Sequence, residues 1–246
     1  MVDSRFRDGG AVAPDPDEAA EPEEASWVTP SRVVVLGLAL MFLAGVVGYR
    51  IGLPNRPGAG SADVGFLQDM IVHHKQAVTM SFRTAEAATD AVVRSFAKEI
   101  IALQEYEIGL MDAWLDGWGH PRESPGSTSM GWAGMAHPKA FMPGMASDQE
   151  LEALDAATGR DLDDRFLRMM IGHHSGGVAM AQAYLERGSD SKVRELAGRI
   201  LKNQRIEISE MNFARQRLGL APVEVPSFDD HLSGGGATTT SAARQP

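Results

Sequence analysis

The chain contains no cysteine. Disulfides, thiolate nucleophiles and cysteine-based zinc or iron-sulfur sites are therefore excluded, and a site for a soft metal ion would have to use thioether and imidazole groups. Basic residues are also scarce, 23 against 33 acidic ones, and the formal charge of −10 speaks against a nucleic-acid partner, because binding phosphates requires a basic face. Aromatic residues make up only 7%, but a hydrophobic content of 43% in 246 residues is enough for one folded domain with appendages.

Both ends of the chain differ from its middle. Residues 1–32 are rich in Pro, Ala and acidic residues, and residues 221–246 are rich in Pro, Ser, Gly and Thr, so both are predicted to be disordered tails. Residues 33–53 are apolar and almost uncharged, and about 20 such residues suffice to span a bilayer. A cleaved signal peptide is the alternative, but its leader is ordinarily short and basic, whereas this one is long and acidic. We therefore predict an uncleaved single-pass anchor in the cell membrane, with the folded part on the extracytoplasmic side.

The remaining residues predict one all-α domain, residues 62–220, behind a linker at 54–61. Its helices are predicted from apolar periodicity and cap signals at about 63–87, 90–116, 161–187 and 190–218. The loop between the two helix pairs, at 117–147, is dense in Gly, Pro and Met. It ends in a capping box, Ser147-x-x-Glu150, which predicts a further short helix.

The two helix pairs repeat each other at a constant offset of 100 residues. Aligned without a gap, residues 66–119 and 166–219 are identical at 19 of 54 positions. The domain is therefore predicted to be a duplicated helical hairpin. The first helix of each hairpin carries the string Phe-Leu-x-x-Met-Ile-x-His-His-x-x-x-Val-x-Met, and the second carries Gln-x-x-Glu-Ile-x-x-Met.

Each copy of the first string places two histidines between two methionines. At about 100° per residue, His73, His74 and Met80 all lie within about 80° of Met70, so thioethers and imidazoles share one helix face. Thioethers favour Cu(I) or Ag(I), and imidazole accepts either copper oxidation state or zinc. A lone Met or His at such a position usually serves packing, but the same quartet occurring twice favours a metal site. The predicted ligands are Met70, His73, His74, Met80, Met170, His173, His174 and Met180.

Two further groups of residues are candidates for the same site. In the second helix of each hairpin a Gln and a Glu recur within the apolar stripe, where buried polar groups need partners. The glutamates either ligate the ion or hold a histidine tautomer by hydrogen bonding, and the glutamines are interpreted as structural hydrogen-bonding groups. The methionines of these helices and of the loop have core packing and low sequence complexity as alternatives. The additional candidates are Glu107, Met111, Glu207, Met211, Met130, Met135, His137, Met142 and Met145.

The two strings, the Met-Pro-Gly-Met segment at 142–145 and the duplicated hairpins resemble the family catalogued as domain of unknown function 305, over about residues 62–220. The resemblance implies a ferritin-like four-helix bundle that is usually exported or membrane-anchored. It also implies copper or silver binding through Met and His, as in some members, and an association with copper tolerance. Carried over by position, the motif residues of the family are the same eight Met and His side chains. The copies differ at Asp69 against Met169 and at Lys75 against Ser175, so the two sites are expected to differ in metal or affinity.

Three classes of function are consistent with these features. We favour a non-enzymatic metal-binding protein that sequesters, buffers or hands over copper, as Cu(I) or Cu(II), to or from an unidentified donor or acceptor protein; a homo-oligomer is left open. A ferritin-like metal-dependent oxidoreductase is the second class, but such enzymes use Glu-x-x-His motifs, and the sequence has none. The third is a membrane-tethered interaction module without bound metal, whose melting temperature would not respond to copper.

Overall fold

In the computed structural model the described residues are 29–52 and 56–225. They belong to two separate units, which divide after Asn55. Most of the two predicted tails, residues 1–28 and 226–246, and part of the predicted linker lie outside the described residues.

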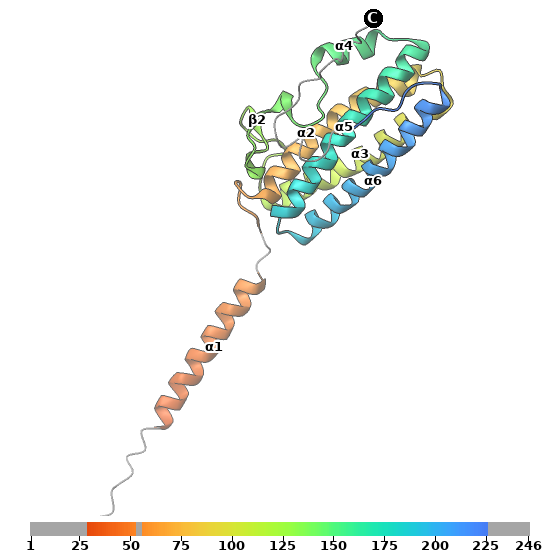
Figure 1. Ribbon diagram of the computed structural model, residues 1–246. Coiled ribbons are helices and arrows are strands. Elements are labelled where there is room, and N and C mark those ends of the chain that lie inside the picture. Colours follow the sequence, from red (N-terminus) through yellow and green to blue (C-terminus); the bar gives the residue numbers. More distant parts are fainter. Residues whose placement is uncertain (1–28, 53–55, 226–246) are drawn as a thin grey trace, which may run out of the picture. The chain divides into compact units, whose positions relative to one another are not determined.

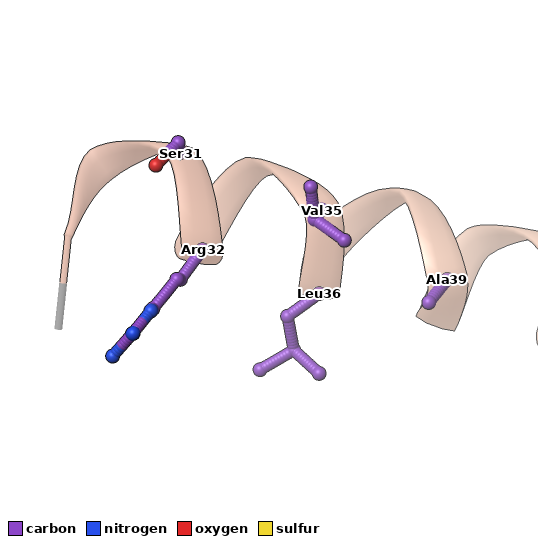
Figure 2. Close-up of a pocket in the computed structure, with 5 residues that line it drawn as sticks. All are labelled: Ser31, Arg32, Val35, Leu36 and Ala39. Atoms are coloured by element: carbon purple, nitrogen blue, oxygen red, sulfur yellow. The ribbon is translucent and has the colours of Figure 1, made fainter. Parts of the chain in front are cut away.

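The first unit contains a single described helix, α1 (Pro30–Gly52). Its stretch Pro30–Tyr49 is long and apolar enough to cross a membrane, a property that a signal sequence shares. Figure 2 shows side chains along the first turns of α1 that line a shallow, open hollow. The described residues that line it all belong to α1.

The second unit is built from long helices that agree closely with the sequence prediction. They are α2 (Ala62–Ala87), α3 (Ala91–Trp118), α5 (Gly159–Arg187) and α6 (Ser191–Arg217). The shorter α4 (Asp148–Ala156) begins at the predicted capping box, in which Ser147 and Glu150 exchange hydrogen bonds. Asp90 and Asp190 cap α3 and α6 by accepting backbone N–H bonds, as the sequence predicted.

The helices are arranged in layers (Figure 1). Within each hairpin α2 packs on α3 and α5 on α6, and the hairpins meet mainly through α2 and α5. The loop after α3 and the helix α4 lie on α2 and α5. Because α2 and α5 are covered on both sides, they bury 15 and 16 residues, against eight each for α3 and α6. The repeated Met and His strings therefore occupy the middle layer.

The loop between α3 and α4 has local structure that the sequence did not predict. Two short strands, β1 (Thr128–Ser129) and β2 (His137–Pro138), pair antiparallel. Two 3₁₀ turns, η1 (Gly131–Ala133) and η2 (Lys139–Phe141), complete it. Strands of two residues are too short to leave an alternating apolar pattern, so no sequence signal marks them.

A pair of aspartates ties each hairpin to the other. Asp63 at the start of α2 accepts hydrogen bonds from Tyr184 and from the loop between α5 and α6, at Ser189 and Asp190. Asp163, its counterpart at the start of α5, accepts three bonds from Thr89 and Asp90, in the loop between α2 and α3. The repeat thus extends to residue 63, just ahead of the predicted string. Each hairpin binds the other through an equivalent aspartate.

Candidate metal centre

All eight predicted ligands point into the protein. Each of these side chains is at most 1% exposed. Helical periodicity places them on one face of α2 and of α5, and the packing of these two helices against each other turns the faces inward. By contrast Glu86 and Glu186, on the opposite face, are exposed.

Two of the four histidines form the centre of this region. The imidazole rings of His73 and His173 lie against each other in a tilted arrangement, with 3.8 Å between centroids and 35° between planes. Burial lowers the pKa of His73 to about 3, and the neighbouring His74 adds to the effect. Burial, followed by the nearby His73, likewise lowers the pKa of His173 well below its ordinary value. Both rings are therefore neutral near pH 7, which is the form that binds a metal ion.

The other two histidines each pair with a glutamate of their own hairpin. Nε2 of His74 lies 2.8 Å from Oε2 of Glu107, and Nε2 of His174 lies 2.7 Å from Oε2 of Glu207. A carboxylate accepts hydrogen bonds, so Nε2 carries a proton in both rings, and in the neutral form of each ring Nδ1 keeps its lone pair. This geometry favours the interpretation that the glutamates orient the histidines, one of the two alternatives left by the sequence.

The histidines leave a set of buried atoms without hydrogen-bond partners. In His73, Nε2 lies 3.1 Å from the carbonyl oxygen of Pro143, which again assigns the proton to Nε2 and the lone pair to Nδ1. Among the described residues, Nδ1 has no hydrogen-bond partner in any of the four rings, and in His173 Nε2 lacks one too. Buried polar atoms are rarely left unpaired, so these five nitrogens indicate that a ligand or ordered water belongs here. Unpaired imidazole lone pairs fit a metal ion such as copper.

The methionines separate into two clusters. The first methionine cluster holds Met70, Met111, Met130, Met142 and Met180 within one apolar core. The second methionine cluster holds Met80, Met170 and Met211 in another. Each cluster thus joins one thioether of the α2 string to one of the α5 string, and only the first cluster also receives methionines from the loop. The sequence repeats the set of candidate ligands in each hairpin, whereas each of the two apolar cores takes methionines from both hairpins.

Several hydrogen bonds to α2 hold the loop, and those made by Asp69 and Gln76 adjoin its methionines. The Oδ2 atom of the buried Asp69 accepts a hydrogen bond from the backbone N–H of Met130 and another from the indole of Trp132. The Gln76 side chain exchanges two hydrogen bonds with the backbone of Ala146. Both anchors belong to α2. Their counterparts in α5, Met169 and Gly176, carry no polar side chain.

On the α5 side the loop backbone lies directly on the helix. A Cβ atom added to Gly176 would come within 2.0 Å of the carbonyl oxygen of Pro143, the atom that bonds His73. Gly144, at a φ of 77°, makes the matching close approach to the backbone of Gly172 and His173. Glycine is required at these positions because any side chain would push the loop away from the two stacked histidines.

The remaining loop candidates differ in how deeply they are buried. Met130 and Met142 are buried, whereas Met135, Met145 and His137 are half-buried. His137 lies in β2, and none of the described contacts joins it to the other four histidines. Among the described residues, no three His, Asp or Glu side chains converge closely enough to hold one ion, so a site here would have to combine imidazole with thioether or amide groups.

Sequence reasoning missed the residues that shape the region rather than line it. These are Asp63, Asp163, Gln76, Pro143 and Gly176. The two aspartates are identical at the 100-residue offset, so extending the repeat by three residues would have found them. The other three act through contacts between the loop and the helices, for which the sequence holds no periodic signal.

Comparison with known proteins gives a consistent picture. Residues 63–215 match the model of the DUF305 family, described as a domain of unknown function. A DUF305 protein from Streptomyces coelicolor, described as a candidate secreted protein, is 36% identical with a TM-score of 0.63, and the match covers 68% of this chain and 99% of that one. A DUF305 fragment from Deinococcus radiodurans is 34% identical with a TM-score of 0.55, covering 63% and 96%.

A third similar structure carries a metal. It is CopM in its Cu(I)-bound form, 27% identical with a TM-score of 0.51, and the match covers 63% of this chain and 96% of that one. A search of curated protein sequences finds no match.

Proposed function

Because the chain belongs to the DUF305 family, we propose that it is a copper-binding protein that sequesters, buffers or hands over the ion without chemical turnover. The observation that carries this proposal is the set of five unpaired imidazole nitrogens on the four buried histidines, next to two clusters of buried methionines. Neutral imidazole and thioether are ligands of copper, and Cu(I) and Ag(I) suit the thioethers. The Cu(I)-bound relative supports the choice of metal.

The proposed roles follow from the contacts. The Nδ1 atoms of His73, His74 and His174 and the ring of His173 would supply nitrogen ligands, while Glu107 and Glu207 hold two of these rings in orientation. The methionines of the first cluster would supply sulfur ligands, and the loop methionines Met130 and Met142 extend that supply. Because the ions would be exchanged rather than transformed, no catalytic residue is assigned.

We also propose that the protein is held in the cell membrane by residues 33–53 and faces the extracytoplasmic side. The apolar helix α1 supports this, as does the secreted character ascribed to the Streptomyces relative. An extracytoplasmic site would bind copper before it reaches the cytoplasm, or release it to an acceptor protein. We take the fold to be a ferritin-like four-helix bundle, on the strength of its two antiparallel hairpins.

The proposal is tested by titrating the full-length protein with Cu(I), Ag(I), Cu(II) and Zn(II) against competing chelators. Replacing His73, His74, His173 and His174 with alanine should remove most high-affinity binding, whereas His120→Ala should not, since His120 instead bonds the backbone of Pro57. The paired change Met70→Leu with Met180→Leu conserves volume and should weaken Ag(I) selectively. Metal that binds the folded state alone must also raise the melting temperature. Unchanged stoichiometry and affinity in the histidine variant would show that the site is wrongly assigned.

A further inference from the structure

The two hairpins differ at a position one helical turn beyond the buried His73 and His173. Residue 77 of α2 is Ala, and the equivalent residue of α5 is Gly177. Residues four apart on a helix share a face, with about 5–6 Å between their Cβ atoms, so residue 177 lies one turn beyond His173 on the same side of α5. This is the side that stacks on His73.

The space left by Gly177 is filled by a side chain from the neighbouring helix. Oε1 of Gln204, on α6, lies 2.2 Å from the point where a Cβ atom of residue 177 would be, and the other amide atoms of Gln204 lie 3.1 Å from it. The amide could not occupy this position if residue 177 were alanine. At the equivalent position of the first hairpin, Ala77 carries the methyl group that Gly177 lacks.

The Gln204 amide is buried and unpaired. Gln204 is 3% exposed, and neither Oε1 nor Nε2 has a hydrogen-bond partner among the described residues. Oε1 of Gln104 is likewise buried without a hydrogen-bond partner among the described residues. A buried amide with both atoms unsatisfied is costly. This amide packs against α5 at residue 177, one turn beyond His173, the one of the four histidines whose two ring nitrogens are both unpaired. An ion between the amide and the imidazole would satisfy both groups.

We propose that Gly177 admits the Gln204 amide as an oxygen ligand and thereby gives the second hairpin a site selective for Cu(II). The inference rests on the proposed function and specifies which ion its second half prefers. A carboxamide oxygen is a hard donor, and nitrogen-oxygen sets suit Cu(II), whereas Cu(I) and Ag(I) prefer sulfur. Ala77 denies the first hairpin this oxygen, and the loop methionines Met130 and Met142 give the first methionine cluster extra sulfur instead.

The test compares Gly177→Ala with Gly198→Ala in the full-length protein, by chelator competition with Cu(II) and with Ag(I). Gly177→Ala should fold, because the atom that must move is the end of a flexible side chain; Gly198→Ala makes the same chemical change where an added Cβ meets nothing within 4 Å. We expect Gly177→Ala to weaken Cu(II) about tenfold or more and to leave Ag(I) within about twofold. Gly198→Ala should change neither.

Gln204→Leu and Gln104→Leu form a second matched pair. Gln204→Leu should reproduce the loss of Cu(II) affinity. It should also change the g value and the copper hyperfine splitting in the electron paramagnetic resonance spectrum of bound Cu(II), because an oxygen ligand is lost. Gln104→Leu should have neither effect. Equal Cu(II) affinities for wild type, Gly177→Ala and Gln204→Leu would overturn the inference and leave copper binding intact. Equal losses in Gln204→Leu and Gln104→Leu would also overturn it. A wild-type protein that binds none of the ions would instead refute the proposed function itself.

Discussion

The two hairpins carry the same set of predicted ligands, but they contact the loop that covers them in different ways. In α2, Asp69 and Gln76 hold the loop by hydrogen bonds to its backbone. In α5, the corresponding region offers Gly176 and Gly177, which leave room for the Pro143 carbonyl and the Gln204 amide. In α2, polar side chains hold the loop by hydrogen bonds, whereas in α5 the absence of side chains at two positions lets neighbouring groups approach the helix.

This difference shows what a single loop does to a duplicated core. The aspartates Asp63 and Asp163 still act reciprocally, because each hairpin has its own helix-helix loop for the other to bind. The Met-rich loop occurs only once, so it cannot contact both copies in the same way. Where this loop packs on the helices, Met130 and Met142 join the first methionine cluster, and the second cluster contains no methionine from the loop.

The largest effect on stability is expected from adding a side chain to α5 at Gly176, where the loop backbone leaves no room for one. Gly176→Ala would place a Cβ atom 2.0 Å from the Pro143 carbonyl oxygen and 2.3 Å from its carbon, both in the backbone, so the loop must move. We expect a loss of about 3 kcal/mol in the free energy of unfolding, from overpacking and from the lost His73 contact, measured by urea denaturation.

The matched change on α2 is Gln76→Ala. It removes two hydrogen bonds to Ala146 without creating a clash, and should cost about 1–2 kcal/mol. A Gly176→Ala variant as stable as Gln76→Ala would mean that the loop does not need the glycine.

The next test concerns the anchor that only α2 possesses. Asp69→Ala should leave the N–H of Met130 and the indole of Trp132 without an acceptor, costing about 2 kcal/mol. Trp132 should become more exposed, with its fluorescence shifted to longer wavelength. Asp69→Asn retains an oxygen at this place and should restore both stability and fluorescence. If Asp69→Ala and Asp69→Asn have the same stability and fluorescence, hydrogen bonding by residue 69 does not hold the loop.

The smallest effect should come from the reciprocal aspartates. Asp63→Asn and Asp163→Asn keep an acceptor oxygen, so each should cost about 1 kcal/mol at pH 7. Equal losses would support the reciprocal arrangement. A loss confined to one of them would show that a single hairpin makes the tie.

Asp63 and Asp69 should also affect the pH dependence of stability in opposite directions. Burial alone would raise the pKa of Asp63, but hydrogen bonds from Tyr184, Asp190 and Ser189 lower it below its usual value. Its stabilising contribution is therefore complete above about pH 4 and is lost as the pH falls through the folded-state pKa. Burial raises the pKa of Asp69, so this carboxyl favours the folded state when protonated and its contribution has the opposite sign. Urea denaturation between pH 3 and pH 7 should show less acid destabilisation in Asp63→Asn and more in Asp69→Asn than in the wild type.

Much of the architecture could be predicted from the sequence because it depends on local, periodic signals. The repeat predicted two hairpins, the cap signals placed the helix starts close to those observed, and the 3.6-residue period predicted the inward face of Met70 and His73. The family resemblance is confirmed by the match over residues 63–215. Metal ligation by the eight side chains stays a prediction.

The sequence could not predict how those inward residues are shared out. The repeat places each histidine pair between methionines of its own helix, but Met70 belongs to the same apolar core as Met180, and Met80 to the same core as Met170. The Pro143 carbonyl and the short strands escaped prediction as well, because backbone atoms in an irregular loop leave no periodic pattern.

The sequence by itself therefore determined which side chains face inward and that the set occurs twice, since helical periodicity and the 100-residue offset are properties of the chain alone. Only the tertiary structure decided which of them meet. Three features depend on the packing of segments distant in sequence: the contact between the rings of His73 and His173, the division of the methionines into two clusters, and the approach of the loop to Gly176. Closely packed surfaces must be complementary in shape, and that complementarity is not encoded in the periodicity of either segment.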